Sequence, residues 1–404
     1  MKYLIIIPDG AADRPLESLG GMTPLDVAAM PYTKSLAEAG ETGLVQTIPD
    51  GVSPGSDAAN LSVMGYDPGV YLTGRSPLEA ASIGIDMAET DVAFRANIIT
   101  LEGDGEYAEL VIKDHSSGDI STEEADELIK AANKEFANDN IRFYTGVSYR
   151  HCLIVKNGST EYDLTPPHDV LGKPAGDHLP RGEGSGFILD MMKRSYAIFK
   201  DHPVNAARKE KGVNPGSSLW IWGQGRKPAL TSFQEKYNVT GSVISAVDLI
   251  KGIGICAGLS SVDVPGATGT INTNYEGKAN AAIEEFKKGK DFVYIHIEGP
   301  DECAHHGDIE GKVICLERID QRLIKTVVEF LKESGESFKV LIVPDHSTPI
   351  CIRTHSAEPV PFVLYDSTKK TAPDANRAFT EESCEKGSFF KSGVALADYF
   401  FGKA

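Results

Sequence analysis

The segment "EGPDECAHHGDIEG" (298–311) holds an unusual density of side chains that can bind a metal ion. Five of them fall within eight residues: Asp301, Glu302, His305, His306 and Asp308. Asp301 and His305 are four residues apart, so they share one face if a helix begins there. We expect Glu302 and His306 to lie off that face, and Asp308 to orient a ligand histidine. The same spacing also arises by chance, so the segment indicates a metal site only if other segments supply matching groups.

Other segments do place acidic or imidazole groups beside apolar, strand-like runs. Asp9 follows the run 3–7, Asp345 and His346 follow the run 339–344, and His355 precedes the run 360–365. Ligands of open α/β sheets bind beyond the carboxyl ends of the strands, so all these groups would meet at one rim. Singly, each is explained as well by an Asx turn, a helix N-cap or a structural histidine. Together they favour a metal site, and carboxylates with imidazoles suit Mn²⁺, Zn²⁺ or iron, and Mg²⁺ less well.

Ser56 is the candidate nucleophile. The stretch "SPGSD" predicts a tight glycine-containing turn, and "DAANLSVMG" predicts a short helix that begins at Ser56. On local evidence alone, a plain N-cap serine explains this pattern best. The functional alternative is a serine oxygen held by a metal, with nearby backbone N–H groups ready for phosphate oxygens. A metal would lower the pKa of the hydroxyl without a histidine base.

These groups need a sheet to position them, and apolar runs alternate with helical patterns along the chain. This alternation predicts an α/β fold, a doubly wound and mostly parallel sheet with helices on both faces. "STEEADELIKAANKEFA" has a capping box at Ser121 and Glu124, and the helical pattern 312–335 ends at Gly335. The predicted strands are 3–7, 151–155, 219–223, 252–258, 292–297, 339–344 and 360–365.

The middle of the chain has a different pattern of predicted elements. Residues 75–215 contain antiparallel-looking strand patterns and loops rich in Pro, Gly and His. We interpret this segment as a smaller α+β domain inserted into the first. The first domain would then be discontinuous and comprise residues 1–74 and 216–404.

The composition of the chain excludes some classes of binding partner. The chain has 404 residues, enough for two domains, and a formal net charge of −18, which argues against a nucleic-acid partner. Its apolar runs are too short for a membrane span. The six cysteines form no CxxC pair, and a reducing cytoplasm fits them best. We therefore expect a cytoplasmic protein with a small-molecule substrate, and neither a nucleic acid nor a membrane as partner; its oligomeric state is not predicted.

An ordered set of motifs resembles one family along nearly the whole chain. They are "IIPDGAADRP", "GSDAANLSVMGYDP", "GRSPLEAASIGI", "FRANIIT", "GVSYRH", "WIWGQGRKP", "GATGTINTNYEGKA", "GPDECAHHGD", "PDHSTP" and "HSAEPVPF". At these residues the chain is similar to the cofactor-independent phosphoglycerate mutases of the alkaline-phosphatase superfamily, and most similar to their shorter, archaeal-type branch. The longer bacterial branch has Ser-Glu where this chain has Ser56-Asp57, and its substrate-gripping arginines do not map cleanly onto this sequence.

The resemblance implies roles for the candidate residues. Asp301, His305 and His355 would hold one divalent metal; Asp9, Asp345, His346 and the Ser56 oxygen would hold the other. Mn²⁺ is favoured, with Mg²⁺, Zn²⁺ or Co²⁺ as alternatives, and no 2,3-bisphosphoglycerate is needed. Ser56 would carry the phosphoryl group between the 3- and 2-positions of glycerate. The inserted domain would bind the substrate and close over it as a lid, and the rest of the chain would be the catalytic domain. Substrate-binding candidates, with Arg150 and Arg226 preferred, are Arg95, His115, Arg150, His168, Lys173, Arg226 and Lys251.

Two other functions stay open. A metal-dependent phosphatase or a phosphopentomutase would use the same metal ligands and nucleophile. A non-catalytic metal-binding or regulatory protein on this scaffold is the alternative from another class. The presence of Ser56 together with all six metal-binding side chains argues against it.

Overall fold

The computed structural model describes residues 1–370 and 372–403, which form two compact units. The first comprises Met1–Leu72 and Ala229–Ala404, and the second, inserted unit comprises Thr73–Pro228. The predicted boundary at 215/216 is corrected by β7 (Ser218–Arg226), because this strand pairs with β3 (Val92–Glu102) of the inserted sheet. Among the described residues no helix is both long and apolar enough to cross a bilayer.

The first unit is built on an eight-stranded sheet in the order β13-β2-β12-β11-β1-β10-β8-β9. Only β12 runs against the others; the pairs of β1 with β10 and with β11 are parallel. This confirms the predicted mostly parallel sheet. The strands are β1 (Lys2–Pro8), β2 (Glu41–Val45), β8 (Gly241–Ile244), β9 (Ser260–Val262), β10 (Phe292–Ile297), β11 (Phe338–Ile342), β12 (Val360–Asp366) and β13 (Ser388–Phe390).

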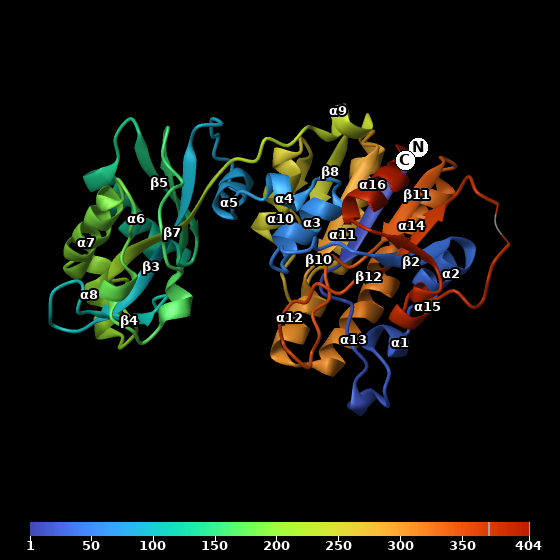
Figure 1. Ribbon diagram of the computed structural model, residues 1–404, viewed down its shortest axis with the longest axis horizontal. Coiled ribbons are helices and arrows are strands. Elements are labelled where there is room, and N and C mark those ends of the chain that lie inside the picture. Colours follow the sequence, from blue (N-terminus) through green and yellow to red (C-terminus); the bar gives the residue numbers. More distant parts are fainter. Residues whose placement is uncertain (371, 404) are drawn as a thin grey trace. The chain divides into compact units, whose positions relative to one another are not determined.

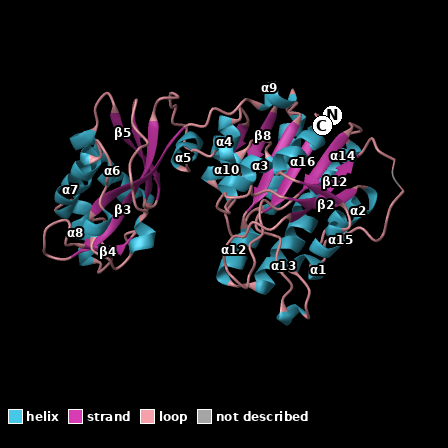
Figure 2. Cartoon of the chain, in the orientation of Figure 1, coloured by secondary structure: helices cyan, strands magenta, loops and turns pink. Residues whose placement is uncertain are grey.

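Helices cover both faces of this sheet, as expected (Figures 1 and 2). Apolar side chains of β1, β10 and β11 share one buried cluster with α2 (Pro31–Ala39), α11 (Tyr275–Lys287), α13 (Ile309–Arg318) and α14 (Lys325–Glu333). On the other face, aromatic rings of β1 and β10 contact α9 (Phe233–Tyr237) and α16 (Gly393–Phe401). The remaining helices of the unit are α1 (Pro24–Val27), α3 (Ser56–Val63), α4 (Pro68–Tyr71), α10 (Asp248–Cys256), α12 (Gly299–His306) and α15 (Glu381–Glu385), with a 3₁₀ turn at Glu17–Leu19.

Two secondary-structure predictions for this unit are wrong. The run 252–258 is not a strand, because residues up to Cys256 belong to helix α10, which buries Leu249, Ile250 and Ile253 at helical spacing. The pattern 312–335 is not one regular helix, since a π-helical turn (Ile319–Ile324) separates α13 from α14. The other predicted strands all occur. Ser121 caps a helix by accepting from the Glu124 N–H, but the predicted capping box is incomplete, because the Glu124 carboxylate pairs with Arg208.

The inserted unit is an antiparallel sheet covered by helices. β3 pairs with β6 (Arg150–Val155), with β7 and, at its end, with β4 (Val111–Asp114); β5 (Ile141–Val147) pairs with β6. Apolar side chains of α6 (Thr122–Phe136) and α7 (Gly186–Lys200) fill its core against β3 and β7. This unit also contains α5 (Ser76–Ser82), α8 (Pro203–Glu210) and two 3₁₀ turns, Pro167–Val170 and Ala175–His178.

Candidate functional site

Three buried aspartates lie at the carboxyl ends of three adjacent strands. Asp9 follows β1, Asp301 lies in α12 directly after β10, and Asp345 follows β11. Because β10, β1 and β11 are neighbouring parallel strands, their ends share one rim of the sheet. The exposed fractions of the three residues are only 1%, 6% and 0%. Carboxylates taken this far out of water need compensation by hydrogen bonds or a cation.

Asp301 is surrounded by two of the predicted histidines. Its Oδ2 lies 3.1 Å from Nε2 of His305, one helical turn later in α12, and its Oδ1 lies 3.5 Å from Nε2 of His355. The two imidazole Nε2 atoms are only 3.0 Å apart. Nδ1 of His305 lies 3.0 Å from the carbonyl oxygen of Arg353, which fits an N–H donor there and leaves Nε2 to face the cluster. Three ligand atoms thus converge from two segments.

A second group gathers around His346. Its Nε2 lies 3.5 Å from both Asp9 Oδ1 and Asp345 Oδ2, and 3.1 Å from the hydroxyl oxygen of Ser56. Ligand atoms of Asp9, Asp345 and His346 all lie within 4.8 Å of one another, and so do those of Asp301, His346 and His355. His346 therefore stands within reach of both groups.

Ser56 does not occupy the N-cap position that its local sequence favours. The N-cap of α3 is Gly55, and Ser56 is the first helical residue. Its hydroxyl points toward His346 instead of capping the helix. Not all of the nearby backbone N–H groups are available to phosphate oxygens, because the Ala58 N–H donates to Oδ1 of Asp57.

The electrostatics of the cluster suit a divalent cation. Burial, reinforced by Asp345, Asp301 and Glu298, raises the pKa of Asp9 well above its usual range. Burial alone would raise the pKa of Asp301 too, but hydrogen bonds from His305 and His355 hold it below its usual value. Asp9 Oδ1 is buried without a hydrogen-bond partner in the described part of the chain. This donor set, carboxylate and imidazole without thiolate, fits Mn²⁺ or a similar ion.

Several polar groups that the sequence analysis missed support the cluster. Asn60 donates from Nδ2 to Asp345 Oδ2 over 2.8 Å, and Tyr294 donates to Asn60 Oδ1. His296 is fully buried, with Nε2 2.9 Å from Asp9 Oδ2. Tyr294 and His296 were detectable, because they are polar groups two residues apart in the otherwise apolar strand β10 and so share one face. Asn60 carries no such signal, and neither does Thr348, whose hydroxyl donates to Asp301 Oδ1.

The other side chains near Asp301 in the sequence do not join the carboxylate and imidazole clusters. Glu302 and His306 pair with each other at the surface, in agreement with the expectation that they lie off the ligand face. Asp308 does not orient a histidine ligand: its side chain accepts from the Gly311 N–H and caps α13. Cys303 is buried and interacts with Cys315.

On the inserted unit, four of the predicted substrate-binding residues join one row of rings and cations. Arg150 lies over the ring of Tyr149, which contacts His115; His115 contacts His168, which contacts Trp222, and Arg95 covers Trp222 at 4.8 Å. Burial lowers the pKa of His168, and the nearby arginines Arg95 and Arg75 lower it further. Arg95 is paired with Glu79, so Arg150 is the exposed guanidinium of the row.

The other three candidates have different surroundings. Arg226 donates to the carbonyl oxygens of Thr90 and Gly158 and so ties two loops together. Lys173 is exposed on a loop beside β4. Lys251 belongs to the first unit, where it pairs with Asp263 at 2.7 Å. Within the described residues of the inserted unit, Arg226 and Lys173 are not members of the row of rings.

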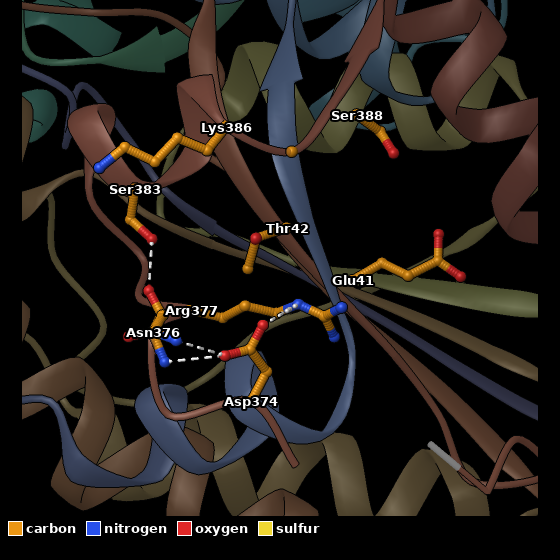
Figure 3. Close-up of a pocket in the computed structure, with 9 residues that line it drawn as sticks. Glu41, Thr42, Asp374, Asn376, Arg377, Ser383, Lys386 and Ser388 are labelled. Carbon is orange, nitrogen blue, oxygen red and sulfur yellow. Dashed lines mark hydrogen bonds and ion pairs between the residues drawn. The ribbon is translucent and has the colours of Figure 1, made fainter. Parts of the chain in front are cut away.

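One cavity of about 320 Å³ lies at the β2–β13 edge of the large sheet (Figure 3). Its polar side chains satisfy one another: Asn376 donates to Asp374, Ser383 donates to the Asn376 carbonyl, and Arg377 lies 3.7 Å from Asp374. None of its lining residues belongs to the carboxylate and imidazole clusters. We assign it no role in the chemistry.

Comparison with known proteins gives a consistent picture. A family model described as 2,3-bisphosphoglycerate-independent phosphoglycerate mutase matches residues 37–205. The mutase of that name from Methanosarcina barkeri is 49% identical over 389 residues, 96% of each chain. A second one, from Methanothermobacter thermautotrophicus, is 45% identical over 369 residues, 90% of this chain and 88% of the relative.

Two solved structures share the fold over essentially the whole chain. A protein of Pyrococcus horikoshii superposes with a TM-score of 0.81 at 29% identity, covering 100% of this chain and 98% of that one. The cofactor-independent phosphoglycerate mutase of Thermoplasma acidophilum gives 0.69 at 28% identity, with 100% and 99% covered.

Proposed function

The chain belongs to the family of 2,3-bisphosphoglycerate-independent phosphoglycerate mutases, and from this premise we propose how its residues interconvert 3-phosphoglycerate and 2-phosphoglycerate. It is an isomerase, and this membership favours the mutase over the phosphatase and the phosphopentomutase considered as alternatives. The proposal concerns the metals, the nucleophile and the groups that hold the substrate.

Two divalent ions would be held by the two groups of residues described above. Asp301, His305 and His355 form one set, and Asp9, Asp345, His346 and the oxygen of Ser56 form the other. The buried, mutually repelling carboxylates and the converging Nε2 atoms support this assignment. We propose Mn²⁺, with Mg²⁺, Zn²⁺ or Co²⁺ able to substitute. The ions would lower the pKa of the serine hydroxyl and neutralise charge on the transferring phosphoryl group.

Ser56 is the proposed nucleophile. Its Oγ forms a bond to phosphorus while the bond from phosphorus to the 3-oxygen of the substrate breaks, and the serine proton ends on the departing glycerate oxygen. The reverse step uses the 2-hydroxyl of glycerate, so phosphoserine returns to serine and 2-phosphoglycerate leaves. No bisphosphoglycerate enters this sequence, because the phosphoryl group is stored on the chain.

The row of rings and cations on the inserted unit is the proposed source of substrate-anion contacts. Arg150 presents an exposed guanidinium group, whose planar fork suits carboxylate and phosphate. Arg95 is paired with Glu79, so it would have to exchange this partner to contact the substrate. His115 and His168 lie between the two arginines in the row. That the inserted unit closes over the substrate stays a prediction, as do substrate-binding roles for Lys173 and Lys251. For Arg226, the hydrogen bonds to the Thr90 and Gly158 carbonyls favour a structural role over substrate binding.

One observation carries the proposal: the Ser56 hydroxyl lies 3.1 Å from His346 Nε2, beside two buried carboxylates, in place of capping its helix. A reducing, cytoplasmic setting is a further proposal, which the absence of CxxC pairs in the sequence supports.

The test supplies Mn²⁺ and 3-phosphoglycerate, without bisphosphoglycerate, and follows both 2-phosphoglycerate and free phosphate. We expect 2-phosphoglycerate with little free phosphate, and phosphate alone would mean that the site hydrolyses its phosphoserine. Ser56→Ala should abolish both products. Ser392→Ala is the matched control, because Ser392 is a plain N-cap that accepts from the Ala395 N–H, and its loss costs only about 1 kcal/mol of stability. Full mutase activity in Ser56→Ala would refute the nucleophile assignment.

A further inference from the structure

The hydroxyl of Thr348 lies between the two groups of proposed metal ligands. Its Oγ1 is 2.6 Å from Asp301 Oδ1 and 3.1 Å from His346 Nδ1, and the residue has no exposed surface. Asp301 belongs to one ligand group and His346 to the other. A single buried hydroxyl therefore contacts both.

The directions of these two hydrogen bonds follow from the chemistry of the atoms. An ionised carboxylate can only accept, so the hydroxyl proton of Thr348 goes to Asp301. The hydroxyl oxygen is then left to accept, so the proton of the neutral His346 ring sits on Nδ1. This places the lone pair on Nε2, the atom that faces Ser56, Asp9 and Asp345. The arrangement is the one a metal-binding imidazole needs.

The rest of the structure fixes Thr348 in this position. Its N–H donates to the Ala12 carbonyl at 3.2 Å, and its own carbonyl accepts from the buried ammonium of Lys312 at 3.0 Å. Gly10, at φ +60, leaves the necessary space, since a Cβ there would lie 2.5 Å from Thr348 Oγ1 and 2.7 Å from Asp301 Oδ1. The loop after β1 and helix α13 thus hold the hydroxyl in place.

We infer that Thr348 is a positioning residue that sets the tautomer of His346 and the orientation of Asp301 together, and so couples the two metal positions. The inference rests on the proposed two-metal function and deepens it. Losing this one hydroxyl should weaken both positions, whereas losing a ligand such as His305 removes a donor from one group alone.

Thr348→Val keeps the shape of the side chain and removes the hydroxyl. Asp301 Oδ1 then loses a donor, and His346 Nδ1 loses its acceptor, so the ring is free to carry its proton on Nε2. We expect Mn²⁺ affinity at both positions to fall about 10- to 100-fold, the usual effect of removing a group that orients a metal ligand. Thr348→Ser restores the hydroxyl and should restore most of the affinity.

The experiment combines Mn²⁺ titration calorimetry with ¹⁵N NMR of histidine-labelled, metal-free protein. The wild type should show His346 protonated on Nδ1, and Thr348→Val should show a shift toward the Nε2-protonated form. Thr100→Val is the matched control: this buried threonine of the inserted unit donates only to the Pro215 carbonyl in the described structure, so Mn²⁺ binding should stay unchanged.

The outcomes separate the two claims. A wild type that binds no Mn²⁺ would refute the two-metal function, while the tautomer in the metal-free protein still decides the role of Thr348. A wild type protonated on Nε2 would overturn the inference even if Thr348→Val did not fold. Equal Mn²⁺ affinity in the wild type and in folded Thr348→Val would overturn it as well.

Discussion

Asn60 and Asp345 are joined by a buried hydrogen bond of 2.8 Å, from the amide nitrogen of one to Oδ2 of the other. The same nitrogen donates to the Ser56 carbonyl, and the amide oxygen accepts from the Tyr294 hydroxyl. The amide therefore connects the nucleophile's helix to a proposed metal ligand, and strand β10 holds its orientation.

Removing the Tyr294 hydroxyl should destabilise the protein. Tyr294→Phe leaves Asn60 Oδ1 buried without that donor, which costs about 1–3 kcal/mol of unfolding free energy. Urea unfolding in the presence of chelator measures this without interference from metals. The control is Tyr365→Phe, at a half-buried tyrosine of β12, which should change stability by less than about 0.5 kcal/mol. Equal effects of the two substitutions would contradict the prediction.

Metal removal should lower thermal stability as well as activity. Asp9, Asp345 and Asp301 repel one another in a buried site, so an ion bound there stabilises the folded chain. At a free Mn²⁺ concentration of 100 times the dissociation constant, each site should add about 2.7 kcal/mol. Thermal melts with chelator and with Mn²⁺ measure the difference. A melting temperature that is the same in both, or activity that persists in excess chelator, would count against bound metals.

Metal binding should release protons at neutral pH. In the metal-free protein, Asp301 raises the pKa of His305 to about 9, above its ordinary value of 6.5. The Asp301–His305 pair therefore contributes stability that is fully present below pH 6.5 and is lost as pH rises through 9. A metal needs the neutral ring, so Mn²⁺ affinity should rise with pH up to about 9 and fall in mild acid. Calorimetry at pH 7.5 in buffers of different ionisation enthalpy should show release of about one proton from His305, and no dependence on the buffer would refute this.

Arg150 and Arg226 should give opposite phenotypes. Arg150 is exposed at the end of the row of rings, so Arg150→Ala should raise KM for 3-phosphoglycerate about tenfold and leave stability unchanged. Arg226 donates hydrogen bonds to the Thr90 and Gly158 carbonyls. Arg226→Ala should therefore lower the free energy of unfolding by about 1–3 kcal/mol, with little effect on KM. Steady-state kinetics and urea unfolding of both variants decide this. A raised KM in Arg226→Ala alone would reverse the assignment.

Periodicity and strand-end chemistry predicted the sheet and the convergence of Asp9, Asp301, Asp345 and His346, because parallel neighbours bring their carboxyl ends to one rim. His355 reaches the same rim because β12 is antiparallel to its neighbours, so this strand begins there. The run 252–258 was wrongly predicted as a strand, because a short apolar run flanked by glycines has the same sequence pattern in a buried helix and in a buried strand. Thr348 and Asn60 could not be found from sequence. Their roles depend on tertiary contacts with residues 47 and 285 positions away, for which a single sequence carries no pattern.

The inserted unit interrupts the first unit between residues 72 and 229, yet it is itself one continuous stretch of chain. During synthesis all of Thr73–Pro228 emerges before β8, β10 and β11 exist. The small antiparallel sheet can form early from nearby segments, whereas β1 must wait for partners some 290 and 335 residues further on. We therefore expect folding to start in the middle of the chain. Strand β2 would remain unpaired longest, because its partners β12 and β13 lie about 315 and 345 residues further along the chain.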